Sequence, residues 1–321
     1  MYFPTITFFQ GNFYPYGITF FNFPTGRISD GRLIPDIIIK YSDSRKPRPF
    51  LDPRRLNSNG VNFACAGAGA LPETNRGLVI DLRTQGSNYR RVSRELRQQL
   101  GEDRGRSLLS TAVYIFSVGG NDYASPLYSN PLNVTFPYSQ QQVVEYVVGN
   151  ITAVIKEIYN EGGRKFSIMN LPALGCAPAL RLLVPGTTIK ACVAAPASAL
   201  ARLHNIALSR SFQNLESQLN GFNYSIFNFY DVFLEMLKYP SKYGLKEGSV
   251  ACCGGGPYRG DYSCGGRRGN PFYQLCSDPG ENLFSDSLHP SDKANEHFAR
   301  LMWNGTSDVI ESYNLNQLFN F

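Results

Sequence analysis

The residues best suited to acid–base chemistry lie near the C-terminus, where Asp286 precedes His289 by three positions. On a turn, this spacing brings a carboxylate beside an imidazole, where it fixes the tautomer and stabilises the imidazolium formed during proton transfer. The same spacing is common without function, so a structural interpretation stays open. Of the other two histidines, His204 lies within a predicted helix and suits packing or the surface better than catalysis. His297 is expected to be exposed on the last helix.

Two glycine-rich turns could supply hydrogen-bond donors to a substrate. Asn121 follows an apolar run and two glycines, so its amide could stabilise a developing oxyanion. The alternative is a strand-to-helix turn that needs Gly and Asn for backbone reasons. Gly67 lies in a second run of small residues, whose backbone N–H groups could face a substrate oxygen or could simply allow close packing. Taken singly, neither turn decides between the two interpretations.

Cysteines and glycosylation signals indicate the compartment. The seven cysteines are Cys65, Cys176, Cys192, Cys252, Cys253, Cys264 and Cys276. Four Asn-x-Ser/Thr sequons begin at Asn133, Asn150, Asn223 and Asn304. Together they predict disulfides and passage through an oxidising, secretory route. A zinc site is the competing interpretation for the last four cysteines, but adjacent cysteines followed by gaps of ten and eleven residues do not match the usual ligand spacing.

The composition suits one large α/β domain, which we place at residues 1–321. Hydrophobic residues make up 43% of the chain and charged residues 17%, a balance that supports a sizeable core. No apolar run approaches the roughly 20 residues of a membrane-spanning helix. The net charge of +6 is spread along the chain without a basic stripe that interleaves with aromatics, so we expect no nucleic-acid partner.

Strand-like and helix-like segments alternate along the chain. Apolar β-prone runs occupy residues 61–65, 112–118, 165–171 and 224–230. Segments with helical periodicity or start signals occupy residues 140–159, 195–219 and 291–303. Because the two kinds alternate, we expect a mainly parallel sheet that is covered by helices on both faces.

The order of these motifs resembles the plant GDSL esterase/lipases of the SGNH hydrolase superfamily. Gly67 in NFACAGAG, Asn121 in GGND, and Asp286 with His289 in DSLHP match three of the four family blocks. Further similar segments are NFYPYGITFF at 12–21, PTGRISDGR at 24–32, NLPALGCAP at 170–178 and ACCG at 251–254. The resemblance extends from Gly11 to about Trp303.

This resemblance implies a three-layer α/β/α, flavodoxin-like fold and hydrolysis of an acyl ester, either a lipid or an acylated metabolite or polymer. It gives His289 the role of general base, Asp286 that of orienting it, and Gly67 and Asn121 that of an oxyanion hole. We expect a secreted monomer that needs no cofactor or metal and inserts into no membrane. The alternative is a catalytically inactive family member that serves as a modifier or binding protein.

Two departures from the family pattern matter. Cys65 stands where the family has Ser, so we expect it to be the unpaired cysteine; Cys176 and Cys192 suit a short-range bridge, and the other pairings stay open. The family's F-G-D-S block, which carries the nucleophile, is absent: no Ser precedes Asn12, and Ser29 belongs to a different block. The first ten residues also lack a signal-peptide pattern. We therefore expect that the natural product begins upstream and that the first strand of the sheet is missing here.

The start of the chain is rich in aromatic residues. These are Phe8, Phe9, Phe13, Tyr14, Tyr16, Phe20, Phe21 and Phe23. They could line a groove for an acyl chain, but we expect them to belong to the core.

Overall fold

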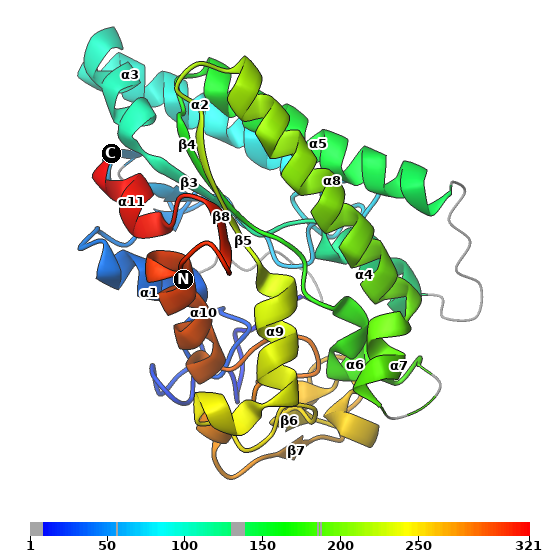
Figure 1. Cartoon of the computed structure of the whole chain (residues 1–321). Coiled ribbons are helices and arrows are strands. Elements are labelled where there is room, and N and C mark those ends of the chain that lie inside the picture. Colours follow the sequence, from blue (N-terminus) through cyan, green and yellow to red (C-terminus); the bar gives the residue numbers. More distant parts are fainter. Residues whose placement is uncertain (1–8, 56, 130–138, 185, 187) are drawn as a thin grey trace.

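A four-stranded sheet forms the centre of the molecule (Figure 1). The computed structural model describes residues 9–55, 57–129, 139–184, 186 and 188–321. The strands, in spatial order, are β3 (Val113–Phe116), β4 (Lys165–Met169), β5 (Asn223–Phe227) and β8 (Ile310–Ser312). The first three run parallel, and β8 is antiparallel to β5. The prediction of a mainly parallel central sheet is therefore confirmed.

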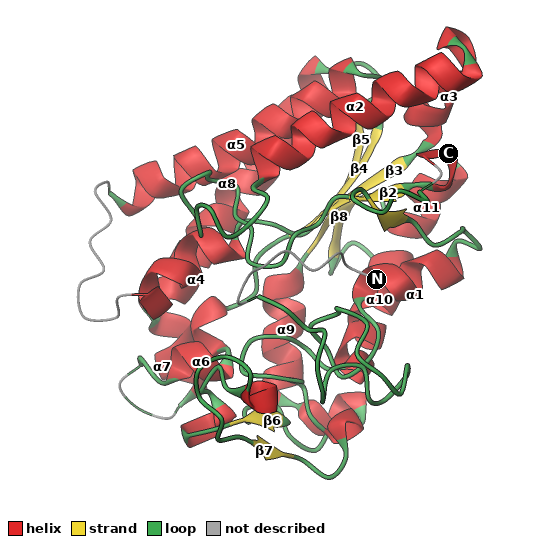
Figure 2. Cartoon of the chain, turned by 180° about the vertical axis from the view of Figure 1, so that it is seen from behind, coloured by secondary structure: helices red, strands yellow, loops and turns green. Residues whose placement is uncertain are grey.

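Helices cover both faces of this sheet (Figures 1 and 2). One face carries α2 (Leu82–Leu100), α5 (Gln140–Asn160) and α8 (Pro196–Gln218). The other carries α1 (Ile34–Tyr41), α10 (Asp292–Asn304) and α11 (Leu315–Asn320). The remaining helices are α3 (Glu102–Thr111), α4 (Gly120–Ser129), α6 (Pro178–Arg181), α7 (Ile189–Ala194) and α9 (Phe229–Lys238). The expected three-layer α/β/α fold is confirmed.

The three predicted helices, α5, α8 and α10, begin and end within one residue of their predicted bounds, whereas α2 was not predicted. At the start of α5, the Ser139 hydroxyl accepts from the Gln142 backbone N–H, and the Gln142 side chain accepts from the Ser139 N–H in return. At the start of α10, the Ser291 side chain accepts from the Ala294 N–H. Both caps are local in sequence; the start signal at Ser291 was predicted, and the cap at Ser139 was not.

Two predicted strands were wrong at their ends. The apolar run at 224–230 stops being a strand at Phe227, because the Asn228 side chain accepts from the Asp231 N–H and starts α9 there. The run at 61–65 forms a strand only at β2 (Val61–Asn62), which pairs in parallel with β1 (Arg48–Pro49) in a separate sheet.

The outer edge of β3 is open within the described part of the chain. β3 pairs with β4 on one side, and no described strand pairs with it on the other. Ile115, in the middle of β3, is 37% exposed. The sheet therefore presents an unpaired strand edge next to the turn where α4 begins.

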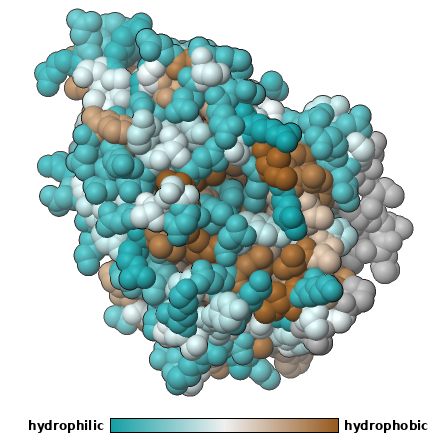
Figure 3. Space-filling view, in the orientation of Figure 1, coloured by the Kyte–Doolittle hydropathy of each residue, from teal (hydrophilic) through white to brown (hydrophobic). Residues whose placement is uncertain are grey.

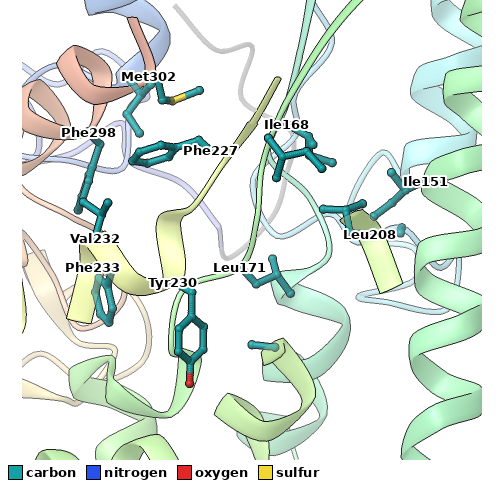
Figure 4. Close-up of a cluster of buried hydrophobic side chains, with 14 of the residues drawn as sticks. Ile151, Ile168, Leu171, Leu208, Phe227, Tyr230, Val232, Phe233, Phe298 and Met302 are labelled. Carbon is teal, nitrogen blue, oxygen red and sulfur yellow. The ribbon is translucent and has the colours of Figure 1, made fainter. Parts of the chain in front are cut away.

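One large cluster of buried side chains packs both faces of the sheet (Figure 4). On one side, Ile168 of β4 lies near Ile151 of α5 and Leu208 of α8. On the other, the rings of Phe227 in β5 and Phe298 in α10 have centroids 6.5 Å apart. Burying a side chain of this size stabilises the fold by about 1.5–3 kcal/mol.

Three disulfides reinforce the fold. Cys176 pairs with Cys192 as expected, and Cys65 is the free cysteine. The two remaining bonds, whose pairing the sequence left open, are Cys252–Cys276 and Cys253–Cys264. Both lie in a segment that contains the short antiparallel pair β6 (Cys253–Gly254) and β7 (Gln274–Leu275). Within the described residues, no group of His, Cys, Asp or Glu side chains has the arrangement of a metal site.

The surface is mostly hydrophilic on the face seen in Figure 3, and apolar residues gather there in separate areas. Among the described helices, none is long and apolar enough to cross a membrane. The aromatic residues near the N-terminus do not all join the core. Tyr16 is buried, whereas Tyr14, Phe20 and Phe23 are more than half exposed, so the core prediction was wrong for these three. Phe8 lies outside the described residues.

Candidate active site

Asp286 and His289 form a hydrogen-bonded pair on a tight turn just before α10. The turn closes through the Ser285 N–H, which donates to the His289 carbonyl oxygen at 2.8 Å. The Asp286 Oδ1 atom accepts from the backbone N–H groups of Leu288 (2.9 Å) and His289 (2.8 Å). The same oxygen lies 2.9 Å from Nδ1 of His289. An ionised carboxylate only accepts hydrogen bonds, so Nδ1 carries the proton and Nε2 keeps its lone pair.

The electrostatic setting keeps Asp286 ionised although the residue is fully buried. Burial by itself would raise the pKa of this carboxyl, but the pKa lies below its usual range. The charge and hydrogen bond of His289 are the largest opposing cause, followed by the charge of Arg268 and the hydrogen bond from Tyr16. The His289 side chain is 36% exposed, and its Nε2 atom has no hydrogen-bond partner among the described residues. The pair has the geometry of a general base with its orienting carboxylate.

Gly67 and Asn121 lie together at the second half of the site. Gly67 follows β2 in a turn and has φ +80°, which favours glycine, and Asn121 lies in the first turn of α4. The Asn121 Nδ2 group donates to the carbonyl oxygen of Ala68 at 2.9 Å. A primary amide has two N–H donors, and this bond uses one of them.

A buried carboxylate fastens this turn to α4. Asp122 accepts from the backbone N–H groups of Ala70 (2.8 Å) and Leu71 (2.9 Å) and from the Thr74 hydroxyl (2.6 Å). The Asn75 side chain donates to the Gly67 carbonyl at 2.6 Å. The sequence analysis missed these roles, although Asp122 directly follows Asn121 in the GGND block.

Two consecutive residues connect the two halves of the site. The Phe9 ring lies directly against Gly67, where an added Cβ would come within 2.6–2.9 Å of three ring carbons. The next residue, Gln10, accepts a hydrogen bond on its carbonyl oxygen from Arg268 at 2.6 Å. Arg268 also bonds to Tyr16, which in turn bonds to Asp286. Residues 9 and 10 therefore contact the Gly67 turn directly and are linked to Asp286 through Arg268 and Tyr16.

The other two histidines and Ser29 are engaged in other contacts. His204 is fully buried, its Nδ1 lies 2.9 Å from the Tyr123 hydroxyl, and burial lowers its pKa to about 3. His297 is only partly exposed, with Nε2 2.9 Å from the Tyr243 carbonyl oxygen, so the prediction of an exposed side chain was wrong. Ser29 is fully buried against Pro290, which is consistent with not assigning it as the nucleophile.

The four sequons have different structural settings. Asn304 is exposed where α10 ends. Asn150 lies inside α5, where its side chain donates to the Tyr146 carbonyl. Asn223 begins β5, and the serine of its sequon is buried within that strand. Asn133 lies outside the described residues.

Known proteins of one family resemble this chain over most of its length. The model of the GDSL-like lipase/acylhydrolase family matches residues 8–302. The chain belongs to this family. A GDSL lipase of Tanacetum cinerariifolium is 45% identical over 97% of this chain and 81% of its own length. GDSL esterase/lipase 5 of Arabidopsis thaliana is 46% identical over 99% of this chain and 83% of its own length. The chain is thus a GDSL-type ester hydrolase by family.

The family also contains a relative whose name denies activity. An inactive GDSL esterase/lipase-like protein of Arabidopsis thaliana is 33% identical over 96% of this chain and 69% of its own length. The family assignment gives ester chemistry to this protein, and the roles of its individual residues have to be argued from geometry.

Proposed function

We propose that the protein hydrolyses acyl esters through His289 as general base, with Asp286 orienting it and Gly67 and Asn121 stabilising the oxyanion. A serine hydroxyl attacks the ester carbonyl while Nε2 of His289 takes up its proton. The developing oxyanion accepts hydrogen bonds from the Gly67 N–H and from the second N–H of the Asn121 amide. His289 then returns the proton to the leaving alcohol, and water releases the acyl group.

The observation that carries this proposal is the state of His289. Its Nδ1 atom is engaged by a buried, ionised Asp286, whereas Nε2 is without a partner among the described residues. Such an imidazole has its lone pair available on the exposed nitrogen, which a general base requires. The described residues bring no serine hydroxyl to Nε2, so we assign the attacking hydroxyl to none of them.

A second candidate function is that of an inactive binding or modifier protein. Two observations favour it: the contact of the Phe9 ring with Gly67 and the hydrogen bond that already joins Asn121 to Ala68. In this case the site would retain affinity for an ester but would not hydrolyse it.

We further propose a secreted, monomeric protein. The three disulfides support folding in an oxidising compartment. The exposed position of Asn304 at the end of a helix supports glycosylation there.

Hydrolysis of p-nitrophenyl butyrate tests the proposed function. The 321-residue chain is compared with a version extended at its N-terminus by an apolar strand that ends in the family's Gly-Asp-Ser block. We expect hydrolysis by the extended version and a loss of several orders of magnitude in kcat for its His289→Ala variant. His297→Ala is the matched control and should keep the full rate.

Two results would count against this function. Hydrolysis that survives His289→Ala would remove the proposed base. An extended version that is folded and binds an ester analogue, yet hydrolyses nothing, would favour the inactive binding protein.

A further inference from the structure

One oxygen of Asp286, Oδ2, bonds to a tyrosine from the start of the chain and also lies 3.1 Å from Nδ1 of His289. The Tyr16 hydroxyl donates to Asp286 Oδ2 at 2.6 Å, although 270 positions separate the two residues. Both are buried, with relative exposures of 1% and 0%. Burial, followed by the charge of Asp286, raises the pKa of Tyr16 well above its usual value. The tyrosine therefore stays protonated and remains a hydrogen-bond donor.

Arg268 completes this chain of hydrogen bonds. Its Nη1 group donates to the Tyr16 oxygen at 2.7 Å, and its Nη2 group donates to the Gln10 carbonyl at 2.6 Å. The guanidinium also lies over the rings of Phe13, Tyr16 and Tyr262, 4.1–5.2 Å from their centroids. A planar guanidinium that donates to two acceptors and stacks on aromatic rings has a single favourable orientation. Arg268 is thereby fixed behind Tyr16.

The disulfide-bonded segment carries Arg268 and is hydrogen-bonded to the residues just before Asp286. Arg268 follows Cys264, which is bonded to Cys253. The Cys253 N–H donates to the carbonyl oxygen of Ser285 at 2.9 Å, immediately before Asp286. The neighbouring Cys252 N–H makes the same bond to Phe284 at 2.9 Å. The loop that supplies the arginine is therefore fastened to the turn that supplies the carboxylate.

The placement of Tyr16 between the two charges has a chemical consequence. An arginine in direct contact with a carboxylate commonly binds both of its oxygens. Here the tyrosine hydroxyl accepts a hydrogen bond from the arginine and donates its own to Oδ2 of Asp286. Oδ1 accepts from the backbone N–H groups of Leu288 and His289 and is the nearer oxygen to Nδ1 of His289, at 2.9 Å against 3.1 Å for Oδ2. Asp286 gains a nearby positive charge without losing the oxygen that orients the imidazole.

We propose that Tyr16 and Arg268 are positioning residues that hold Asp286 ionised and aimed at Nδ1 of His289, and so fix the tautomer that the reaction needs. The inference rests on the proposed roles of Asp286 and His289. The ionisable groups that face the carboxylate are His289, Tyr16 and Arg268, and Tyr262 lies against the far side of the guanidinium. Neither positioning residue touches the substrate.

The tautomer of His289 is measurable without turnover. The chain has three histidines, so ¹⁵N labelling of histidine gives few ring signals to assign. In the 321-residue chain we expect His289 as the Nδ1–H tautomer with a downfield Nδ1–H proton. Tyr16→Phe and Arg268→Met should turn this into a mixture of tautomers and weaken or abolish the downfield signal. Tyr14→Phe and Arg267→Met, which alter exposed neighbours of the same types, are the matched controls and should leave both unchanged.

Kinetics of the ester-hydrolysing form give a second readout. Loss of a hydrogen bond to a charged group should lower kcat about tenfold in Tyr16→Phe. KM should stay the same, because Tyr16 does not contact the ester. Arg268→Lys keeps the charge but loses the fork, and should recover part of the loss that Arg268→Met shows.

A folded Tyr16→Phe variant with an unchanged His289 tautomer overturns the proposal, whatever its hydrolysis rate. Should Arg268→Met fail to fold, Tyr16→Phe and Arg268→Lys decide the matter, since Tyr16→Phe removes a single oxygen. The tautomer readout does not depend on hydrolysis. An extended version without hydrolysis, together with the expected tautomer changes in the 321-residue chain, would therefore refute the proposed function and support the positioning role.

Discussion

Replacing Asp122 by alanine should be among the most destabilising single changes near the site. The carboxylate is 3% exposed and accepts three hydrogen bonds, two from backbone N–H groups and one from Thr74. Alanine leaves all three donors without an acceptor, at about 1–3 kcal/mol each. Removing a buried charge offsets part of this loss, because burial disfavours the ionised form and raises the pKa of Asp122. The net loss is about 4 kcal/mol.

This free energy converts into a measurable melting shift. An entropy of unfolding of about 2.1 cal/mol/K per residue gives roughly 0.7 kcal/mol/K for the whole chain, so the melting temperature should fall by about 6 °C. The melting temperature of Asp122→Asn should lie between those of the parent and Asp122→Ala. An amide oxygen at the Oδ1 position keeps the bonds from Leu71 and Thr74 and loses the one from Ala70. Asp103→Ala changes an exposed carboxylate on α3 and serves as the control.

Scanning fluorimetry at one fixed heating rate checks the order of the three variants. The reasoning is refuted if Asp122→Ala melts within about 1 °C of the parent or of the Asp103 control. An asparagine variant that is less stable than the alanine variant would also refute it, because the loss of stability would then not come from unpaired donors.

Three further outcomes follow from the structure. Replacing both Cys253 and Cys264 by serine removes a cross-link between residues 11 positions apart. It should lower the free energy of unfolding by about 3 kcal/mol, seen as a lower urea midpoint than that of the parent. When the protein is secreted from a eukaryotic host, Asn304→Gln should lower its intact mass by that of one N-glycan, whereas Asn223→Gln should not. Intact-mass spectrometry measures the difference. Gly67→Ala should lower the melting temperature by several degrees in the same fluorimetric assay, because alanine is strained at φ +80° and its Cβ would meet the Phe9 ring.

The sequence predicted α5, α8 and α10 well because their signals are local. The Ser139 cap and the apolar stripe of α5 lie within one segment, and the same is true of Ser291 and α10. The predicted end of β5 was wrong because the apolar run continues through Phe229 and Tyr230, whereas the cap formed by Asn228 starts a helix there. Hydrophobicity by itself does not distinguish the two sides of that boundary.

The site was predictable only in part, for a related reason. Asp286 and His289 are three residues apart, so their contact is visible in the sequence. The contact of Asp286 with Tyr16 spans 270 positions, and nothing in the composition of either segment signals it. Arg268 lies in a glycine-rich loop without periodicity, where its orientation depends on disulfide pairings that the sequence left open.

The two halves of the site use buried carboxylates in opposite electrostatic ways. Asp122 holds neutral N–H and O–H donors, and burial, the largest cause, raises its pKa. Its linkage contribution to stability is therefore greatest below the unfolded pKa of about 3.9 and is lost as pH rises through the folded value. Asp286 has a lowered pKa because His289 and Arg268 outweigh its burial. Its contribution is present above about pH 3.9 and is lost as pH falls.

This contrast follows from what each carboxylate has to hold. A turn of backbone N–H groups needs an acceptor of fixed position, and positive charge nearby would add nothing to its geometry. An imidazole that becomes charged during proton transfer needs a carboxylate that is already ionised, because only then does the imidazolium gain a partner. Burying that carboxylate without a cation would raise its pKa and remove this advantage. The cost of burying Asp286 is therefore the physical reason for an arginine behind it, and the tyrosine between them keeps the arginine from competing with His289.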